Sequence, residues 1–379
     1  MTASLNEKLR TVKWGEFKYK EVFNRIEQGR RLKKDDQIDG TIPFVMSGTT
    51  NAGVVNYISN PVASFPKNAI TIDIFGNTFY RNYAFGAGDD TGVYWNDATA
   101  YSSNAMLFFA VAMQKSMMGR FSYGKKLRSS QSEDFTMHLP VTDDGAIDFD
   151  FMESFIAELE AERVAELSAY LTVSGLDNYE LSEQELKALA ELKNVTWGKY
   201  KMGDLFEKVK TKKLPYKAKE LPTEATGKYT LPCLTSSFKN QGLNYFAPVQ
   251  GATVLKSVIT IPQNSDVYRA YYQSSDFTVL SDAYAIDWKF DKRTLSREQY
   301  LFMVMCINKV TDLPIYSYKN KLGGWNVVKD KYILLPQVNG EIDFNYMEDF
   351  ISAMQKLAIK DVVSFTDRKI AGTKEVIAK

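Results

Sequence analysis

Hydrophobic and polar positions follow two different patterns along this chain of 379 residues. Short β-branched and aromatic runs, punctuated by Gly, Pro, Asn and Asp, fill residues 1–145 and again residues 194–340. Such runs are typical of strands joined by turns. After Asp148 and again after Asp343, apolar residues recur at i, i+3, i+4 and i+7, which predicts an amphipathic helix. The expected order is therefore a strand-rich domain, helices, a second strand-rich domain and a final helix.

Each of the two long helices is predicted to be about 22–25 residues long, and Gly175 is expected to end the first one. A shorter helix is predicted to begin after Ser182, because Ser182 and Glu185 have the spacing of a capping box. The apolar stripe of the long helices approaches the spacing of 3.5 residues found in helix pairs. An antiparallel pair around a pseudo-two-fold axis is expected, and the alternative is that each helix only covers its own domain. The residues assigned to this helix pair are Met152, Phe155, Leu159, Met347, Phe350, Met354 and Leu357.

The chain contains an internal duplication. The stretch VKWGEFKYKEVFNRI (12–26) returns as VTWGKYKMGDLFEKV (195–209), and GAIDFDFMESFIAEL (145–159) returns as GEIDFNYMEDFISAM (340–354). The offset grows from 183 to 195 residues between these two pairs, so the second copy is longer by 12 residues. The period is too long for a solenoid of stacked repeats. Two copies of one domain and its helix are therefore expected.

Between these stretches, IPFVMSGTTNAGVVNYI (42–58) aligns with LPCLTSSFKNQGLNYFA (231–247). Tyr80-Arg81 is further aligned with Tyr268-Arg269. Trp14 and Trp197, with Phe23 and Phe206, occur in both copies and are expected in the two hydrophobic cores. The predicted fold is α+β, with boundaries at 1–145 for the first domain, 146–193 for a central helical spacer, 194–340 for the second domain and 341–379 for a C-terminal helical spacer.

Charge is segregated along the chain although the net charge is only +1. The four segments carry +2, −9, +9 and −1 in chain order. One basic domain and one acidic helical block suggest two partners of opposite character. The alternative is that the acidic helices are simply solvated faces.

Composition argues against a membrane protein and against several enzyme classes. No run of about 18 apolar residues occurs and the N-terminus lacks the apolar core of a signal peptide, so a cytoplasmic location is expected. Cys233 and Cys306 stand in unrelated contexts, which fits a reducing compartment. His138 is the only histidine, so a His-based triad or a clustered zinc site has almost no ligands to draw on. No cofactor is expected.

The stretch GRFSYGKKL (119–127) nearly spells a phosphate-cradling loop. Its counterpart PIYSYKNKL (314–322) has lost both glycines, and Lys126 occupies the position where that loop needs Ser or Thr. What the two copies share is an aromatic and basic character, which suits contact with a phosphate backbone. Asp287-Trp288-Lys289 resembles the tail of a nuclease site but has no upstream partner. We expect no catalytic activity from this chain alone.

The repeated motifs carry a resemblance to a known family. Two copies of W-G-x-[FY]-K with [DE]-[VL]-F, then [IL]-P with G-[VL], a charged aromatic loop, and G-x-I-D-F-x-[FY]-M-E-x-F-I before a long helix resemble specificity (S) subunits of type I restriction–modification systems and of the related type IIB systems. The resemblance covers nearly the whole chain. It implies that each strand-rich domain is a target-recognition domain reading half of a bipartite site in double-stranded DNA. It also implies that the helices set the half-site separation and dock DNA adenine methyltransferase subunits, two per chain, together with restriction (nuclease or translocase) subunits.

Candidate DNA contacts are taken from the repeated loops, from the polar turns and from one basic run. Polar side chains can read base edges and positive charges bind phosphate. For each residue the alternative is an ordinary exposed charge or turn position. In the first copy they are Thr49, Asn51, Arg81, Lys125, Lys126, Arg128 and Ser130, and in the second copy Lys208, Lys210, Lys212, Lys213, Lys239, Asn240, Arg269, Lys319, Lys321, Trp325 and Asn326.

Two other classes of function stay open at this stage. A duplicated β-rich scaffold or glycan-binding module would use the 23 Phe, 22 Tyr and 5 Trp as sugar platforms. Such a module should not show the steep salt dependence that DNA binding has. A stand-alone nuclease or methyltransferase would turn over substrate as a purified chain.

Overall fold

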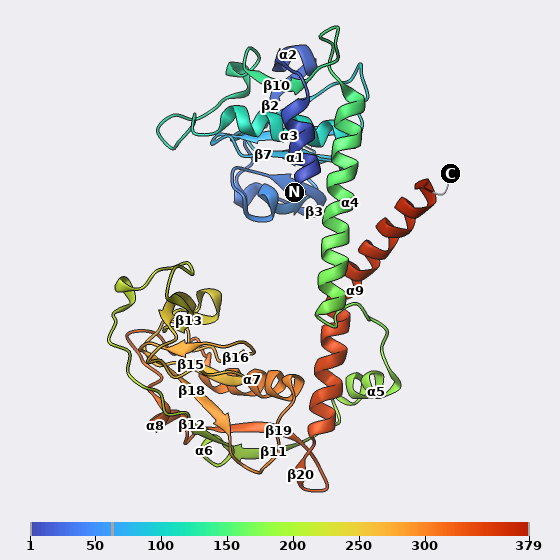
Figure 1. Cartoon of the computed structure of the whole chain (residues 1–379). Coiled ribbons are helices and arrows are strands. Elements are labelled where there is room, and N and C mark those ends of the chain that lie inside the picture. Colours follow the sequence, from blue (N-terminus) through green and yellow to red (C-terminus); the bar gives the residue numbers. More distant parts are fainter. Residues whose placement is uncertain (1, 62–63, 378–379) are drawn as a thin grey trace. The chain divides into compact units, whose positions relative to one another are not determined.

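The computed structural model of the chain describes residues 2–61 and 64–377. It divides into two compact units, Met1–Tyr170 with Thr366–Lys379 and Leu171–Phe365 (Figure 1). Each unit holds one strand-rich domain, which agrees with the duplication seen in the sequence. The two units are described separately below.

The first domain contains, in chain order, α1 (Ala3–Thr11), β1 (Trp14–Lys18), α2 (Tyr19–Val22), β2 (Arg25–Gln28), η1 (Lys34–Asp36), β3 (Asp39–Val45), η2 (Thr50–Gly53), β4 (Val54–Ile58), β5 (Ser64–Phe65), β6 (Ala69–Asp73), β7 (Thr78–Arg81), β8 (Phe85–Ala87), β9 (Thr91–Trp95), α3 (Ser103–Met117), η3 (Ser129–Gln131) and β10 (Thr136–Pro140). The helix α4 (Phe149–Val173) follows it.

The second domain is preceded by α5 (Glu183–Glu191) and contains β11 (Thr196–Lys201), α6 (Met202–Leu205), β12 (Phe206–Lys208), η4 (Ala218–Glu220), β13 (Tyr229–Leu234), η5 (Lys239–Gly242), β14 (Leu243–Pro248), β15 (Val258–Pro262), β16 (Tyr271–Gln273), β17 (Thr278–Val279), β18 (Ala283–Trp288), α7 (Arg297–Thr311), α8 (Trp325–Val328), β19 (Tyr332–Val338) and β20 (Glu341–Ile342). The helix α9 (Phe344–Ile377) follows it.

The two domains share one topology. A four-stranded sheet has the order β2-β9-β6-β7 in the first domain and β12-β18-β15-β16 in the second. A second sheet, β4-β3-β8-β5 or β14-β13-β17, holds one parallel pair in each case, β3 with β8 and β13 with β17. An antiparallel pair, β1 with β10 or β11 with β19, closes each domain. The internal duplication predicted from the sequence is therefore a duplication of the fold.

The strand register corrects one part of the sequence alignment. In the first domain Ala69 lies opposite Arg81, and in the second domain Val258 lies opposite Gln273. The structural counterpart of Arg81 is therefore Gln273 and not Arg269, as the repeated Tyr-Arg dipeptide suggested. The hairpin between β15 and β16 is longer than the one between β6 and β7, so Arg269 lies in the connection before β16 rather than on the strand.

The cores are only partly as expected. Phe23 and Phe206 are buried at 1% and 0% exposure, which confirms their assignment. Trp14 and Trp197 were expected in the core, but they are 43% and 40% exposed. Trp14 lies on β1 and stacks on Phe108 of α3, and Trp197 lies on β11 and stacks on Phe302 of α7. The second face of each tryptophan therefore stays open to solvent.

The two long helices begin where the sequence predicts. The Asp148 carboxylate accepts a hydrogen bond from the Phe151 amide at 2.8 Å, and Asp343 accepts one from the Tyr346 amide at 2.9 Å. Gly175, at φ 65°, follows the end of α4 as expected, because this conformation suits glycine. The helix α9 has 34 residues and is longer than predicted.

The structure corrects the residues assigned to a helix pair. Met152 and Phe155 belong to the core of the first domain, and Met347 and Phe350 belong to the core of the second. The first turns of each long helix therefore cover their own domain, which is the alternative weighed above. Leu159 is partly buried against the first core, while Met354 and Leu357 are each 46% exposed.

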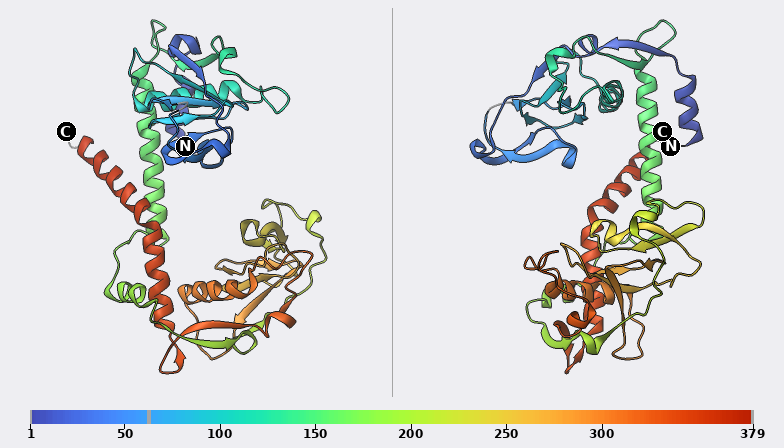
Figure 2. Two further views of the ribbon diagram at one scale, coloured as in Figure 1. Left: turned by 180° about the vertical axis from the view of Figure 1, so that it is seen from behind. Right: turned by 90° about the vertical axis from the view of Figure 1, so that its left-hand side faces the viewer.

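A short helix before each domain packs along the long helix after it. In the first unit α1 lies beside α4, and Lys8 forms an ion pair with Glu158 (Figure 2). In the second unit α5 lies beside α9, and the Glu185 carboxylate accepts hydrogen bonds from Ser352 and from Lys356, the latter at 2.9 Å (Figure 1). The capping box predicted at Ser182 begins α5 as expected. The sequence reasoning did not foresee α1.

The far end of α9 also contacts α4 within the first unit. Lys369 forms an ion pair with Glu160 at 2.6 Å. Both side chains are close to half exposed, so this pair adds little to stability. This contact supports pairing of α9 with α4 within the first unit, and the rest of the predicted helix pair stays a prediction.

Replacing Glu185 by Gln is expected to destabilise the second unit by about 1–2 kcal/mol at pH 7, as for a buried hydrogen bond to a charged group. Burial alone would raise the pKa of Glu185, but hydrogen bonds from Ser352 and the Ser182 amide and the charge of Lys356 lower it below its ordinary value. The lowered pKa means that the stabilisation is complete above the ordinary glutamate pKa and disappears as the pH falls through the folded-state value. Urea unfolding of Glu185→Gln and of the exposed control Glu183→Gln between pH 3 and 7 measures this, and a Glu185→Gln defect that is equally large at low pH would contradict it.

Candidate nucleic-acid interface

Three segments far apart in the sequence meet at the end of β6 in the first domain. Ser47 and Gly48, which begin the polar turn before β4, bond to the Asp73 carboxylate. The Ile74 carbonyl accepts a hydrogen bond from the Leu127 amide at 3.0 Å, so the loop after α3 joins the same place. The Ile74 amide in turn donates to the Asp90 carbonyl at 3.0 Å. Two of the predicted contact loops are therefore neighbours in space.

The Asp73 carboxylate organises this junction. It is 4% exposed, and one oxygen accepts hydrogen bonds from the Phe75 and Asn77 amides. The other oxygen accepts from the Ser47 hydroxyl at 3.1 Å, the Gly48 amide at 3.0 Å and the Asn77 side chain at 2.8 Å. A buried carboxylate with this many donors is satisfied and holds the start of the turn in place.

The polar turn has the same unusual backbone in both domains. Asn51, Ala52 and Gly53 have φ values of 48°, 50° and 81°. Their counterparts Asn240, Gln241 and Gly242 have φ values of 45°, 53° and 87°. Three consecutive residues in the left-handed region form a tight, closed turn that presents its side chains outward. The predicted contacts on these turns are all exposed, namely Thr49, Asn51, Lys239 and Asn240.

The aromatic and basic loops also share a structure. Each forms a tight turn, from Ser122 to Lys125 in the first domain and from Ser317 to Asn320 in the second. Lys126 lies 4.8 Å from the ring centre of Tyr123, and Lys321 lies 4.8 Å from that of Tyr318. Leu127 and Leu322 are buried and anchor the two loops.

The arrangement explains why the first of these loops is not a phosphate-cradling loop. It follows the helix α3, whereas that motif needs a strand before the loop and a helix after it. Lys125, Lys126, Lys319 and Lys321 are exposed.

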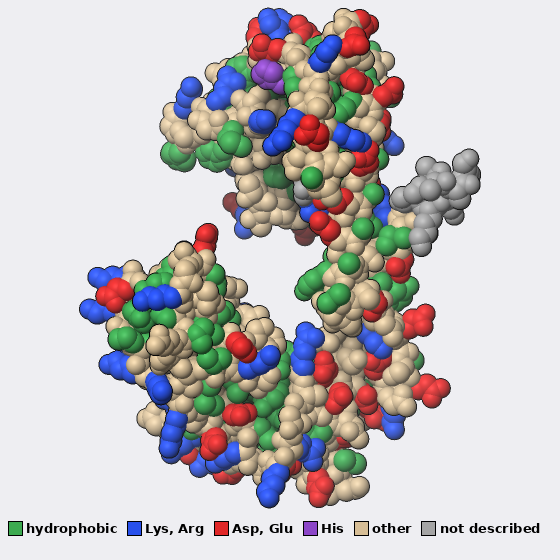
Figure 3. Space-filling view, in the orientation of Figure 1, with side chains coloured by type: hydrophobic (Ala, Val, Ile, Leu, Met, Phe, Trp, Pro, Cys, Tyr) green, Lys and Arg blue, Asp and Glu red, His purple; other side chains and the backbone are tan. Residues whose placement is uncertain are grey.

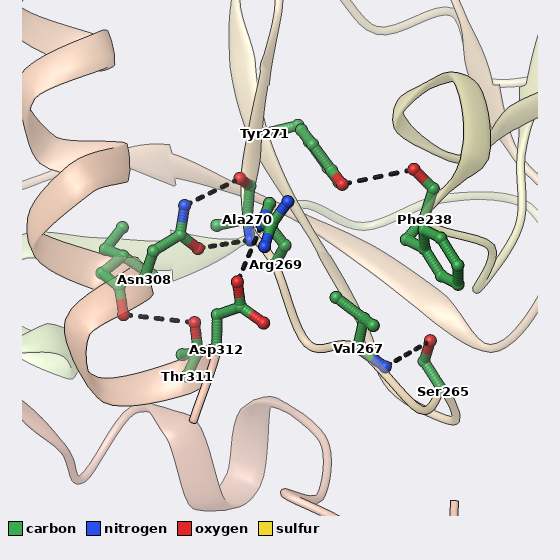
Figure 4. A network of polar contacts seen from close by, with 10 residues as sticks. Phe238, Ser265, Val267, Arg269, Ala270, Tyr271, Asn308, Thr311 and Asp312 are labelled. Atoms are coloured by element: carbon green, nitrogen blue, oxygen red, sulfur yellow. Dashed lines mark hydrogen bonds and ion pairs between the residues drawn. The ribbon is translucent and has the colours of Figure 1, made fainter. Parts of the chain in front are cut away.

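The second domain joins its turn and loop in a similar way. The Tyr268 hydroxyl donates to the Ser317 carbonyl at 3.5 Å, and the Tyr318 amide donates to the Asp266 carboxylate at 2.9 Å. On the other side of this connection, the Tyr271 hydroxyl donates to the Phe238 carbonyl at 3.3 Å (Figure 4). The connection before β16, together with the first residue of that strand, therefore links the turn at η5 to the loop after α7.

Arg269 lies in this connection and is exposed, as a DNA contact requires. Its Nε donates to Asp312 at 2.7 Å, and this carboxylate raises the pKa of Arg269 (Figure 4). Next to it, Asn308 bonds both the amide and the carbonyl of Ala270, so the backbone is held from α7. Arg269 thus presents a positive charge from a fixed position, with the Nε edge of its guanidinium already bonded to Asp312.

Arg81 is placed quite differently, and its assignment as a DNA contact is corrected here. It is 2% exposed. Its Nη2 donates to the Ala52 carbonyl at 2.6 Å and its Nε donates to the Thr71 hydroxyl at 3.1 Å. Since the guanidinium is enclosed behind the turn, Arg81 cannot contact a base or a phosphate from this position.

Basic residues line two equivalent connections, the one after β2 in the first domain and the one after β12 in the second. Lys208, at the end of β12, and Lys210, Lys212 and Lys213 are all exposed, as predicted. The first domain has an equivalent stretch that the sequence reasoning missed, with exposed Arg30, Arg31, Lys33 and Lys34. An alignment of the residues after WGEFKYKEVFNRI with the residues after its repeat would have indicated this basic stretch.

A cavity of about 780 Å³ lies beside this missed basic stretch. It is lined by Arg31, Lys33 and Lys34 together with Met46 and Asp89. Arg128, one of the predicted contacts, donates to the Asp89 carbonyl at 2.5 Å and so borders the same region. The first domain therefore gathers basic side chains from the connection after β2 and from η3 next to the polar turn.

The remaining candidates are dispersed. Ser130 is exposed in η3, and Asn326 is exposed in α8. Trp325 is half-buried and packs against the core of the second domain near Tyr284, so it is mainly a structural residue. Figure 3 shows Lys and Arg side chains spread over the strand-rich part of the second unit, whereas Asp and Glu gather on the side that carries α5.

The side chains that could bind a metal ion or act in a nuclease site were located in the structure. Among the described residues no group of three or more His, Cys, Asp or Glu side chains could hold a metal ion. Asp287 accepts a hydrogen bond from the Tyr300 hydroxyl at 2.8 Å. His138 is exposed on β10. Within the same described part of the chain, no helix is long and apolar enough to cross a membrane.

Comparison with known proteins identifies the class of the first domain. Residues 11–169 match the family described as type I restriction modification DNA specificity domain. This stretch runs from the end of α1 through most of α4, so it includes the whole strand-rich domain. The resemblance inferred from the repeated motifs is therefore confirmed for residues 11–169, which are similar to the specificity domains of restriction–modification systems.

Individual relatives agree with this assignment. The specificity subunit S.BcgI of a type II restriction enzyme from Heyndrickxia coagulans is 28% identical over 155 residues, which cover 40% of this chain and 45% of that protein. The match thus spans less than half of the relative's length. The crystal structure of a type I restriction–modification S subunit from M. genitalium aligns over 97% of this chain and 94% of that one, with 13% identity and a TM-score of 0.54. This likeness confirms the predicted fold class, with two strand-rich domains in tandem, each followed by a long helix.

Proposed function

We propose that this chain is a non-catalytic specificity subunit that binds double-stranded DNA at a bipartite, asymmetric site. The first target-recognition domain is assigned to residues 1–145 and the second to residues 194–340, and the two helical spacers to residues 146–193 and 341–379. Each domain reads one half-site. The proposal rests mainly on one observation: both domains expose the same polar turn and the same aromatic and basic loop. The match of the first domain to a DNA specificity family supports it.

Asymmetry follows from how the two copies differ. Both keep the backbone of the turn, but the exposed residues are Thr49, Thr50 and Asn51 in one and Phe238, Lys239, Asn240 and Gln241 in the other. Base edges are distinguished by the side chains that reach them. Two domains with different side chains on the same frame therefore recognise two different sequences.

The partners of this subunit are DNA methyltransferase subunits, two per chain, and restriction subunits that cleave or translocate. The acidic side that carries α5 and the first part of α9 supports a protein-facing role, because phosphate would be repelled there. The duplicated architecture supports two methyltransferase sites. The chain directs these enzymes to the site and needs no cofactor of its own.

Salt titration of DNA binding tests the proposal against a glycan-binding or scaffold role. We expect the purified chain, alone or with its methyltransferase, to bind duplex DNA with an affinity that falls steeply with salt, by roughly 10³ or more between 50 and 200 mM if six or more phosphates are contacted. A neutral oligosaccharide array is the control. Binding to glycans with no dependence on salt, and none to DNA, would overturn the proposal.

A further inference from the structure

The polar turns at η2 and η5 have a backbone that needs support. A left-handed conformation costs about 1–2 kcal/mol for a residue with a side chain, and Asn tolerates it better than others. Each turn places Asn, then a residue that tolerates it poorly (Ala52 or Gln241), then Gly in this region. Such a conformation persists only where the surroundings determine it.

In both domains one side chain at the same strand position supports the centre of the turn. In the first domain Arg81 donates to the Ala52 carbonyl at 2.6 Å and to the Thr71 hydroxyl at 3.1 Å. In the second domain Gln273 donates to the Gln241 carbonyl at 3.2 Å and to the Thr260 hydroxyl at 3.1 Å. Ala52 and Gln241 are the central left-handed residues of the two turns, and Thr71 and Thr260 lie on the equivalent strands β6 and β15.

Two chemically different side chains thus make the same pair of contacts. Both are buried, at 2% exposure for Arg81 and 3% for Gln273. Arg81 makes its other contacts with the Tyr83 hydroxyl at 3.2 Å and the Phe79 ring at 5.2 Å, neither of which is an acid. What the two domains have in common is therefore a buried donor that joins the turn to the sheet, and not a charge.

We propose that Arg81 and Gln273 are positioning residues that fix the two turns in the shape in which their exposed side chains read base edges. This inference rests on the proposed function. It assigns sequence discrimination in each half-site to a rigid turn, namely Thr49–Asn51 in the first domain and Phe238–Asn240 in the second. The turns share a frame, and the side chains mounted on it set the specificity.

The test uses the full chain in complex with its methyltransferase, on duplexes carrying the cognate site or a substitution in one half-site. Arg81→Met removes both hydrogen bonds, so we expect discrimination in the first half-site to fall roughly tenfold or more, about the worth of a base-edge contact. Discrimination in the second half-site and the salt slope should stay unchanged. Gln273→Leu should give the mirror result. Arg81→Gln, which installs the donor that the second domain uses, should restore discrimination in the first half-site.

The outcomes separate this inference from its alternatives. If Arg81→Met keeps full discrimination, the turn does not depend on the contact and the inference fails. If Arg81→Met flattens the salt slope by about one unit, Arg81 contacts phosphate and is not a positioning residue. Should Arg81→Met not fold, Gln273→Leu and Arg81→Gln still decide the matter, because failure of Arg81→Gln to support discrimination in a folded complex would contradict it. Absence of any bipartite recognition by the wild-type complex would instead refute the proposed function.

Discussion

Replacing Phe350 by Asp is expected to unfold the second domain. Phe350 is 8% exposed and packs its ring against Phe302 of α7 and Tyr346 of α9. Removing a large buried ring costs about 3–5 kcal/mol, and an unpaired carboxylate in its place adds a further penalty. That loss is comparable with the whole stability of a typical domain. Thermal unfolding followed by circular dichroism, with proteolysis to locate the unfolded part, measures the effect.

The matched control lies four residues further along the same helix. Met354 is 46% exposed, so Met354→Asp should leave the second domain folded and change its stability by less than about 1 kcal/mol. If Phe350→Asp instead leaves the domain intact and only weakens assembly with the methyltransferase, Phe350 belongs to a partner-facing surface and its place in the domain core is mistaken.

Changing Lys210, Lys212 and Lys213 together to Ala is expected to weaken DNA binding about 10- to 1,000-fold at moderate salt. All three lie in the exposed connection after β12. Each phosphate contact that is lost removes about 0.9 from the slope of log K against log salt, so the slope should fall by about 2–3. The loss should be similar for cognate and unrelated duplexes, because phosphate contacts carry no base identity.

The control for this triple variant is a second set of exposed lysines in the same unit. Lys187 lies on α5, Lys360 lies on α9, and Lys193 lies in the short connection between α5 and β11, so none of them belongs to the connection after β12. Changing them to Ala alters the net charge equally but should leave the slope within about one unit of wild type. Equal losses for both sets would mean that binding follows net charge alone and that the connection after β12 has no special role.

Local signals in the sequence predicted where α4, α5 and α9 begin and located the two aromatic and basic loops, but α1, α3 and α7 were not predicted. Asp148, Asp343 and Ser182 mark helix starts because a short polar side chain can bond the free amides there. The duplicated motif contains the same tyrosine and lysine in both copies, so a comparison of the copies located Tyr123 with Lys126 and Tyr318 with Lys321.

The predictions that were wrong concern features that tertiary structure determines. Arg81 was aligned with Arg269 because the dipeptide matches, but the register between strands is set by hydrogen bonds that the linear sequence does not show. Phe155 and Phe350 were assigned to a helix pair because their spacing fits one, yet the same spacing serves a helix that covers its own domain. Trp14 has the composition of a core residue and lies at an edge where only one face is covered.

Two parts of the candidate site could not be predicted from the sequence. The turn at Thr49–Gly53 was chosen for its polar composition, and its left-handed backbone came only from the structure. The basic stretch Arg30–Lys34 was not among the predicted contacts, and Asp35 and Asp36 directly after it make the segment less basic as a whole. Its location beside the turn becomes visible only when β2, β9 and β3 are assembled.

The central claim is that this chain supplies the sequence specificity of a DNA methyltransferase. The most direct measurement is a single-base methylome of cells that express the methyltransferase with and without this chain. We expect methylated adenines within a motif of two different half-sites at a fixed separation, present only when the chain is expressed. Methylation at the same positions without the chain, or no chain-dependent motif while the methyltransferase is demonstrably active, would contradict the claim.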